Sequence, residues 1–169
     1  VDQLQWDMGT ITEALAIGNR FTLGDVIPGG DDTECMVMRH ENGAVSAYVE
    51  SWATPHRMQG IRLEIFGKKA SARLVYNNDG TRQIWKSDES GMNVVWEYDP
   101  AKEDHMDVFG GAKDMQGQIS HFIECILDGK QPLTHGREAI RPMQAIACAT
   151  AAGENHTMYN VDEWLAMRG

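Results

Sequence analysis

Hydrophobic residues at the start of the chain follow a helical spacing. Val1, Leu4 and Met8 fall at positions i, i+3 and i+7, which places them on one face of a helix. No Ser, Thr, Asp or Asn precedes Val1 as an N-cap. We therefore expect the chain to start inside an amphipathic helix, with the upstream part belonging to a longer protein.

The middle of the chain changes to the period-two spacing of β-strands. Asn42-Gly43 separates two strand-forming runs, and Asn-Gly is the strongest short signal for a hairpin. Gly67 and Asn78-Asp79-Gly80 predict further turns. After the first hairpin turn, three apolar residues alternate with three more polar ones, namely Val45, Ala47 and Val49 with Ser46, Tyr48 and Glu50. This alternation predicts that the apolar face of the strand is packed and that the other face is more polar.

Helical spacing returns in the last third of the chain. Gly129 ends one predicted helix, and Pro142 predicts a late start or a kink in the next. The first of these helices carries an apolar stripe formed by Met115, Ile119, Phe122, Ile123 and Ile126. Strands in a run followed by helices in a run predict an α+β fold: an open, mostly antiparallel sheet with helices packed on one face. No linker or repeat divides residues 1–169, so we expect a single domain.

Composition and charge narrow the range of partners. The 169 residues are 42% hydrophobic and 24% charged, which is ordinary for a globular protein, and no apolar run approaches the ~20 residues of a membrane span. A net charge of −10 argues against nucleic acid and anionic membranes, because phosphate binding requires clustered Lys and Arg. An odd number of cysteines without a CxxC motif predicts that Cys35, Cys125 and Cys148 are reduced core thiols in a cytoplasmic protein.

Familiar catalytic and metal-binding motifs are absent from the sequence. It contains no GxGxxG after a strand, no GxSxG and no HExxH. Asp31 and Asp32, followed by Glu34, Cys35 and His40, match the spacing of no closed metal site, and we interpret this run as a loop leading into a strand. The histidines are interpreted singly as surface or core residues. We expect no metal and no cofactor bound to this chain.

One segment combines residue types suited to ligand binding. Trp52, His56 and Arg57 lie in a predicted loop between two strands, and Tyr48 lies on the strand before it. Loops at the end of a rigid sheet commonly carry binding residues. An aromatic ring, an imidazole and a guanidinium together suit a polyhydroxylated or anionic substrate. The alternative is a solvent-exposed turn anchored by Trp52.

The order of several segments matches a known pattern. An opening helix, "VDQLQWDMG", is followed by a strand pair containing "ENGAV", then by "LEIFGKKAS" and by a helix ending in "HFIECILDGKQPLT". Over residues 1–161 this order resembles the C-terminal domain of the glucose–fructose oxidoreductase/inositol dehydrogenase/MocA (Gfo/Idh/MocA) family. The resemblance implies an open, dihydrodipicolinate reductase-like sheet that forms the substrate wall and an oligomer interface.

The resemblance also implies what lies outside this chain. In the family, an N-terminal Rossmann domain binds NAD or NADP, and a Lys, an Asp and a His are catalytic. These positions all fall before Val1, so this chain has no catalytic or cofactor-binding residue, and Asp2 supports the helix that follows the histidine. We expect the parent protein to be an NAD(P)-dependent oxidoreductase of sugar or cyclitol metabolism. The isolated chain is expected to be inactive, with Tyr48, Trp52, His56 and Arg57 lining the substrate pocket.

A second hypothesis is a stand-alone dimerisation or binding module. A sheet with helices on one face leaves its other face to be covered, here by a second copy in a dimer or tetramer. Residues assigned to that contact are Met36, Met38, Tyr48, Trp85 and Val95. An unrelated α+β binding domain remains the third alternative.

Overall fold

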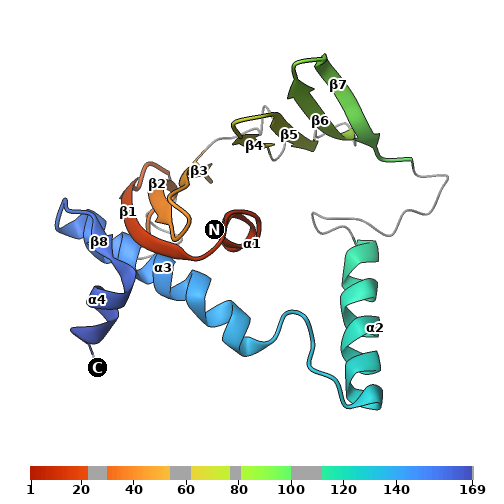
Figure 1. Cartoon of the computed structure of the whole chain (residues 1–169). Coiled ribbons are helices and arrows are strands. Elements are labelled where there is room, and N and C mark those ends of the chain that lie inside the picture. The colour runs from red at the N-terminus through yellow and green to blue at the C-terminus, as the bar shows by residue number, and fades with distance from the viewer. Residues whose placement is uncertain (23–29, 54–61, 77–80, 100–111, 169) are drawn as a thin grey trace. The chain divides into compact units, whose positions relative to one another are not determined.

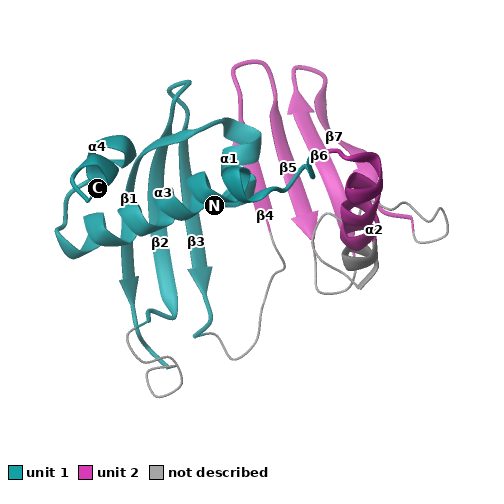
Figure 2. Ribbon diagram, turned by 90° about the horizontal axis from the view of Figure 1, so that it is seen from below, with its two compact units in different colours: residues 1–54, 131–169 teal, residues 55–130 magenta. Residues whose placement is uncertain are grey.

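The computed structural model describes residues 1–22, 30–53, 62–76, 81–99 and 112–168, with the side chains of residues 112–116 excepted. The chain forms two compact units, shown in different colours in Figure 2. The first contains residues 1–54 and 131–169, and the second contains residues 55–130. Each unit has its own antiparallel sheet of four strands.

The first unit combines a sheet with helices from both ends of the chain (Figure 1). Its strand order is β3-β2-β1-β8, and all neighbours are antiparallel. The Asn42-Gly43 turn connects the strand that ends at His40 to the strand that begins at Val45, as the hairpin prediction requires. The elements are α1 (Asp2–Met8), β1 (Ile11–Asn19), β2 (Thr33–His40), β3 (Val45–Ser51), α3 (Gly136–Glu154), β8 (Tyr159–Asn160) and α4 (Val161–Ala166).

Helix α3 lies close against strand β1 on one face of this sheet (Figure 2). Ala14 and Ala16 of β1 are buried there, and a Cβ added to Gly153 of α3 would lie 2.0 Å from the Ala16 carbonyl oxygen. Such a close approach requires small side chains on both elements. Helix α3 provides them with the buried residues Ala145, Cys148, Ala149, Ala151 and Ala152.

The structure reverses the expected faces of the β2–β3 hairpin. Met36 and Met38 are buried, and they pair with Tyr48 and Ser46, which therefore lie on the same face as the core. The opposite face is open: the side chains of Val45, Ala47 and Val49 are exposed. The prediction of a packed face formed by these three residues was therefore wrong, as was the assignment of Met36 and Met38 to a contact between copies.

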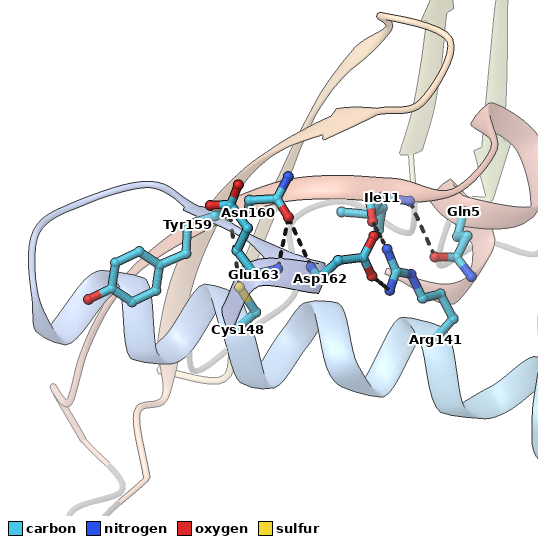
Figure 3. Close-up of polar contacts among 8 residues, drawn as sticks. All are labelled: Gln5, Ile11, Arg141, Cys148, Tyr159, Asn160, Asp162 and Glu163. Atoms are coloured by element: carbon cyan, nitrogen blue, oxygen red, sulfur yellow. Dashed lines mark hydrogen bonds and ion pairs between the residues drawn. The ribbon is translucent and has the colours of Figure 1, made fainter. Parts of the chain in front are cut away.

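Polar contacts join the C-terminal elements of this unit to β1 (Figure 3). Arg141 of α3 donates to Asp162 of α4 at 2.6 Å and to the main-chain oxygen of Ile11 at 3.1 Å. Asn160 is the N-cap of α4 and accepts from the main-chain N–H groups of Asp162 and Glu163. These contacts attach α4 and β8 to the sheet.

His40 attaches the end of α1 to the hairpin. Its side chain is 1% exposed, Nδ1 donates to the Gly9 carbonyl at 2.7 Å, and Nε2 lies 2.9 Å from Ser46 Oγ. With both ring nitrogens engaged in the core, His40 is a structural residue.

The second unit contains a four-stranded sheet with the order β4-β5-β6-β7 and the helix α2. Its elements are β4 (Arg62–Phe66), β5 (Ser71–Tyr76), β6 (Arg82–Asp88), β7 (Gly91–Glu97) and α2 (Ala112–Asp128). The turn predicted at Gly67 is present, and the Gly67 N–H donates to the Ala70 oxygen at 3.0 Å. The turn predicted at residues 78–80 lies outside the described residues.

The α+β fold class predicted from the sequence is confirmed, with the strands divided between two antiparallel sheets. Helix α3 starts at Gly136 and runs through Pro142, so a start delayed by this proline was not observed. In the described part of the chain, no helix has the length and apolar character needed to cross a membrane.

Candidate functional site

Several groups suited to ligand binding lie together where β2 begins and β3 ends. Glu34 of β2 pairs directly with Glu50 of β3, and Tyr48 is two residues away from Glu50 on the same strand face. Trp52 follows the last residue of β3. We call Glu34, Tyr48, Glu50 and Trp52 the acidic–aromatic cluster. The antiparallel register of the β2–β3 hairpin positions Glu34, Tyr48 and Glu50.

Glu50 is the common partner of the two aromatic residues. The Tyr48 hydroxyl donates to Glu50 Oε2, and the Trp52 indole N–H donates to Glu50 Oε1 at 2.7 Å. Each carboxylate oxygen therefore fixes one aromatic side chain, and hydrogen bonds to a charged acceptor are stronger than neutral ones. Trp52 as a whole residue nevertheless remains 61% exposed.

The surroundings of the acidic–aromatic cluster raise the pKa values of two of its members, Glu34 and Tyr48. Burial raises the pKa of Glu34, and the charges of Asp31 and Glu50 raise it further. Burial also raises the pKa of Tyr48, and its hydrogen bond to Glu50 acts in the same direction. Both shifts follow from negative charges gathered in a partly desolvated place.

The start of α1 lies within electrostatic range of this cluster. Burial lowers the pKa of the Val1 amino group, while the charges of Asp2 and Glu50 oppose that shift. Glu50 of the cluster is thus one of the charges that act on the Val1 amino group.

A second set of contacts fixes the main chain around the cluster. Thr33 Oγ1 and Ser51 Oγ are 2.8 Å apart, and the main-chain N–H of Trp52 donates to the Asp32 oxygen at 2.6 Å. The side chain of Asp32 is 3% exposed and accepts from the main-chain N–H groups of Phe21 and Thr22. The position of Trp52 is thus determined at both its main chain and its ring.

This arrangement suits a neutral ligand that carries several hydroxyl groups. Carboxylate oxygens accept hydrogen bonds from hydroxyls, and a phenol oxygen that has donated its own hydrogen can still accept one. An exposed indole ring provides an apolar surface beside these polar groups. Binding sites for small molecules commonly join apolar area with a few fixed polar groups.

The structure brings together two of the four residues assigned to substrate binding. Tyr48 and Trp52 share Glu50 as their partner. His56 and Arg57 lie outside the described residues. Sequence reasoning missed Glu34, although counting back from the Asn42-Gly43 turn places it opposite Glu50.

The remaining candidate residues have structural surroundings. Cys125 and Cys148 are buried free thiols as predicted, whereas Cys35 is exposed, so its assignment to the core was wrong. Cys35 lies on the open face of β2 beside Val37, because residues two apart share a strand face. Among the described residues, no group of three or more His, Cys, Asp or Glu side chains is arranged to hold a metal ion.

An apolar groove between α3 and α4 has a volume of about 540 Å³. Ile140, Met143, Ala147 and Trp164 line it, and none of its lining residues is titratable. The groove therefore offers packing area and no acid–base group, so the acidic–aromatic cluster is the better candidate for substrate recognition.

Comparison with known proteins gives one family match that covers most of the chain. Residues 1–161 match the family described as "Oxidoreductase family, C-terminal alpha/beta domain" (GFO_IDH_MocA_C). No curated protein matches the sequence.

Several solved structures share the fold at low sequence identity. Levoglucosan dehydrogenase in complex with NADH and L-sorbose is 18% identical, with a TM-score of 0.76 over 95% of this chain and 47% of that chain. An oxidoreductase from Agrobacterium radiobacter, in complex with NAD⁺, L-tartaric acid and magnesium, is 16% identical with a TM-score of 0.72, over 96% of this chain and 47% of that one. Aldose-aldose oxidoreductase from Caulobacter crescentus, complexed with glycerol, is 13% identical with a TM-score of 0.72, over 94% of this chain and 44% of that chain. The chain thus spans less than half the length of each of these structures.

Proposed function

Because this chain belongs to the oxidoreductase family defined by the C-terminal alpha/beta domain GFO_IDH_MocA_C, we propose that it is the substrate-binding and assembly domain of an NAD(P)-dependent oxidoreductase. The proposed reaction is hydride transfer from a hydroxyl-bearing carbon of a sugar or cyclitol-like substrate. The dinucleotide-binding domain and the catalytic Lys, Asp and His belong to polypeptide upstream of Val1. The chain alone is proposed to be inactive.

The shared partner Glu50 is the observation that carries the proposal. It holds the Tyr48 hydroxyl and the Trp52 indole at the end of β3. A wall of fixed acceptors and an exposed aromatic ring orients a polyol without reacting with it. Two of the similar solved structures are complexes with polyhydroxylated molecules, L-sorbose and glycerol. We propose that His56 and Arg57 complete this wall.

The residues of this chain do not themselves fit a nicotinamide dinucleotide. The paired strands in the described part of the chain are all antiparallel. A dinucleotide pyrophosphate needs a glycine-rich turn between a parallel strand and a helix N-terminus. We therefore assign NAD or NADP to the upstream domain and derive no cofactor contact from this chain.

Assembly through the open face of the β3-β2-β1 sheet is the second part of the proposal. Ile17, Val37, Val45 and Val49 are exposed on that face, and the last two are 60% and 72% exposed. Contiguous apolar area of this kind is characteristic of an interaction surface. A second copy provides a matching surface by two-fold symmetry, so we propose a homodimer or a tetramer built from it. A stand-alone dimerisation module would use the same face.

The free thiols support a reducing compartment, and we propose the cytoplasm. Cys35 is exposed and unpaired with another cysteine, which is unusual for a protein that matures in an oxidising environment.

The test is made on the full-length gene product, with the 169-residue chain as the comparison. NADH and NADPH binding is measured by fluorescence, and reduction of NAD⁺ and NADP⁺ is followed with a panel of sugars and cyclitols. We expect the full-length product to bind one cofactor and to turn over a polyol, and the chain alone to do neither. A gene product that begins at Val1 and binds neither cofactor would overturn the enzyme proposal and leave the dimerisation module.

A further inference from the structure

Asp32 has a position in the first unit that neither the sequence motifs nor the family match explains. Its side chain is 3% exposed although it carries a carboxylate. Its Oδ2 accepts from the main-chain N–H groups of Phe21 at 2.9 Å and Thr22 at 2.7 Å. Its Oδ1 accepts from the Phe21 N–H at 3.1 Å and from the Thr33 hydroxyl at 3.3 Å. The buried charge is thus compensated by several converging donors.

The main chain of Asp32 connects two further segments. Its N–H donates to the oxygen of Asn19, the last residue of β1, at 3.1 Å. Its carbonyl oxygen accepts the main-chain N–H of Trp52, just after β3, at 2.6 Å. One residue therefore joins the end of β1, the start of β2 and the residue that follows β3.

These contacts bear on the acidic–aromatic cluster through Trp52. The ring of Trp52 is fixed by Glu50, but its main chain is fixed by Asp32. Loss of the main-chain hydrogen bond to Asp32 would remove one of the contacts that fix Trp52, and the ring could then shift relative to Glu50. Precise recognition requires binding residues that are themselves held by surrounding contacts.

We infer that Asp32 is a positioning residue for substrate recognition: its carboxylate holds the strand ends so that Trp52 faces the polyol. This inference rests on the proposed function, and it goes beyond it by naming a residue outside the cluster that determines substrate affinity. Asp32 itself does not contact the substrate. It acts through Trp52 alone.

A carboxylate is needed here because the donors approach both of its oxygens. An amide of the same size has one acceptor oxygen and presents N–H groups on its other side. Asp32→Asn therefore places a donor against the donors from Phe21, Thr22 or Thr33, with almost no change in volume. Glu154→Gln also replaces a carboxylate by an amide, on the exposed end of α3 and outside the acidic–aromatic cluster, so it is the control.

Two readouts separate the positioning role from a general loss of stability. The first is the Trp52 indole resonance, together with the exchange rate of the Trp52 main-chain amide, in ¹H–¹⁵N spectra of the 169-residue chain. The second is the affinity for L-sorbose measured by titration in the same spectra. In Asp32→Asn we expect a displaced or broadened indole resonance, faster amide exchange at Trp52 and about tenfold weaker L-sorbose binding. In Glu154→Gln we expect all three to stay within twofold of the wild-type values.

A lower melting temperature with unchanged Trp52 resonances and unchanged L-sorbose affinity would overturn the inference, because Asp32 would then be only structural. If Asp32→Asn does not fold, Thr33→Val gives the same test, since it removes the hydroxyl that contacts both Asp32 and Ser51. Unchanged Trp52 resonances in that variant would overturn the inference as well. A wild-type chain that does not bind L-sorbose, combined with a displaced Trp52 in Asp32→Asn, would count against the proposed function and still support the positioning of Trp52 by Asp32.

Discussion

The indole N–H of Trp52 donates to Glu50 Oε1 at 2.7 Å, and this contact joins an exposed aromatic ring to a carboxylate on the core-side face of the sheet. The other oxygen of the same carboxylate accepts from Tyr48. Glu50 thus determines the geometry of both aromatic groups proposed to meet the substrate. Replacement of Glu50 should weaken substrate recognition more than it lowers the stability of the fold. The acidic–aromatic cluster lies at the open end of the hairpin, opposite the Asn42-Gly43 turn.

Glu50→Gln should weaken binding of a polyol such as L-sorbose by about tenfold, since a glutamine offers one acceptor oxygen for two donors. Calorimetric titration of the wild-type chain and the variant measures the change. Glu154→Gln, on the exposed end of α3, is the control and should bind as the wild type does. Equal affinity in all three proteins would show that Glu50 does not organise the site.

The raised pKa of Glu34 leads to a pH-dependent stability difference. The folded chain holds the Glu34 proton more tightly than the unfolded chain, so stability is lost as the pH rises from the ordinary value of 4.5 through the raised pKa. The Glu34→Gln variant has no carboxyl group at this position, so it does not lose stability in this way as the pH rises. The melting temperature of the variant minus that of the wild type should therefore increase between pH 4 and pH 7, as measured by thermal unfolding. A difference that is constant or decreases with pH would contradict the assignment.

The two faces of β2 should respond differently to truncation. Met38 is 1% exposed and Val37 is 40% exposed. Met38→Ala should lower the free energy of unfolding by about 2–5 kcal/mol, because it leaves a cavity in the core. Val37→Ala should cost less than about 1 kcal/mol in the monomer. Chemical denaturation measures both values, and a larger effect for Val37 would reverse the assignment of the faces.

A charge on the open face should disrupt assembly. Val49→Lys places an ammonium group on the exposed apolar surface of β3. If two copies bury this face against each other, the dissociation constant should rise at least about tenfold, because an unpaired charge is costly to bury. Sedimentation equilibrium of the chain measures the change, with Met167→Lys after α4 as the control. A wild-type chain that is monomeric at high concentration would refute assembly through this face.

The fold class could be predicted from the sequence because hairpin signals and helical spacing are local. The Asn42-Gly43 turn and the spacing of Ile119, Phe122 and Ile126 need no knowledge of distant residues. Strand β1 was not predicted, since Ala14 and Ala16, two of its three buried residues, are weak strand formers. Those alanines are explained only by the close approach of α3 at Gly153.

The faces of the hairpin were assigned incorrectly for a related reason. Alternation shows that a strand has two different faces, but the more apolar one need not be the one covered within the chain. Here the covered face carries Ser46 and Tyr48 beside Met36 and Met38, and the open face carries the valines. Such a pattern is expected where a second molecule covers the open face. The candidate site was predicted in part, through Tyr48 and Trp52, while Glu34 and Asp32 depend on cross-strand contacts.

We propose that the open end of the β2–β3 hairpin contacts a polyhydroxylated substrate, and a titration with L-sorbose followed through the Trp52 indole resonance tests this proposal. The chain contains five tryptophans, and Trp52→Phe identifies the resonance. We expect a progressive, saturable shift of the Trp52 signal, while the signals of Trp6 and Trp164 stay in place. No shift at Trp52, or a shift confined to Trp164 beside the α3–α4 groove, would contradict it.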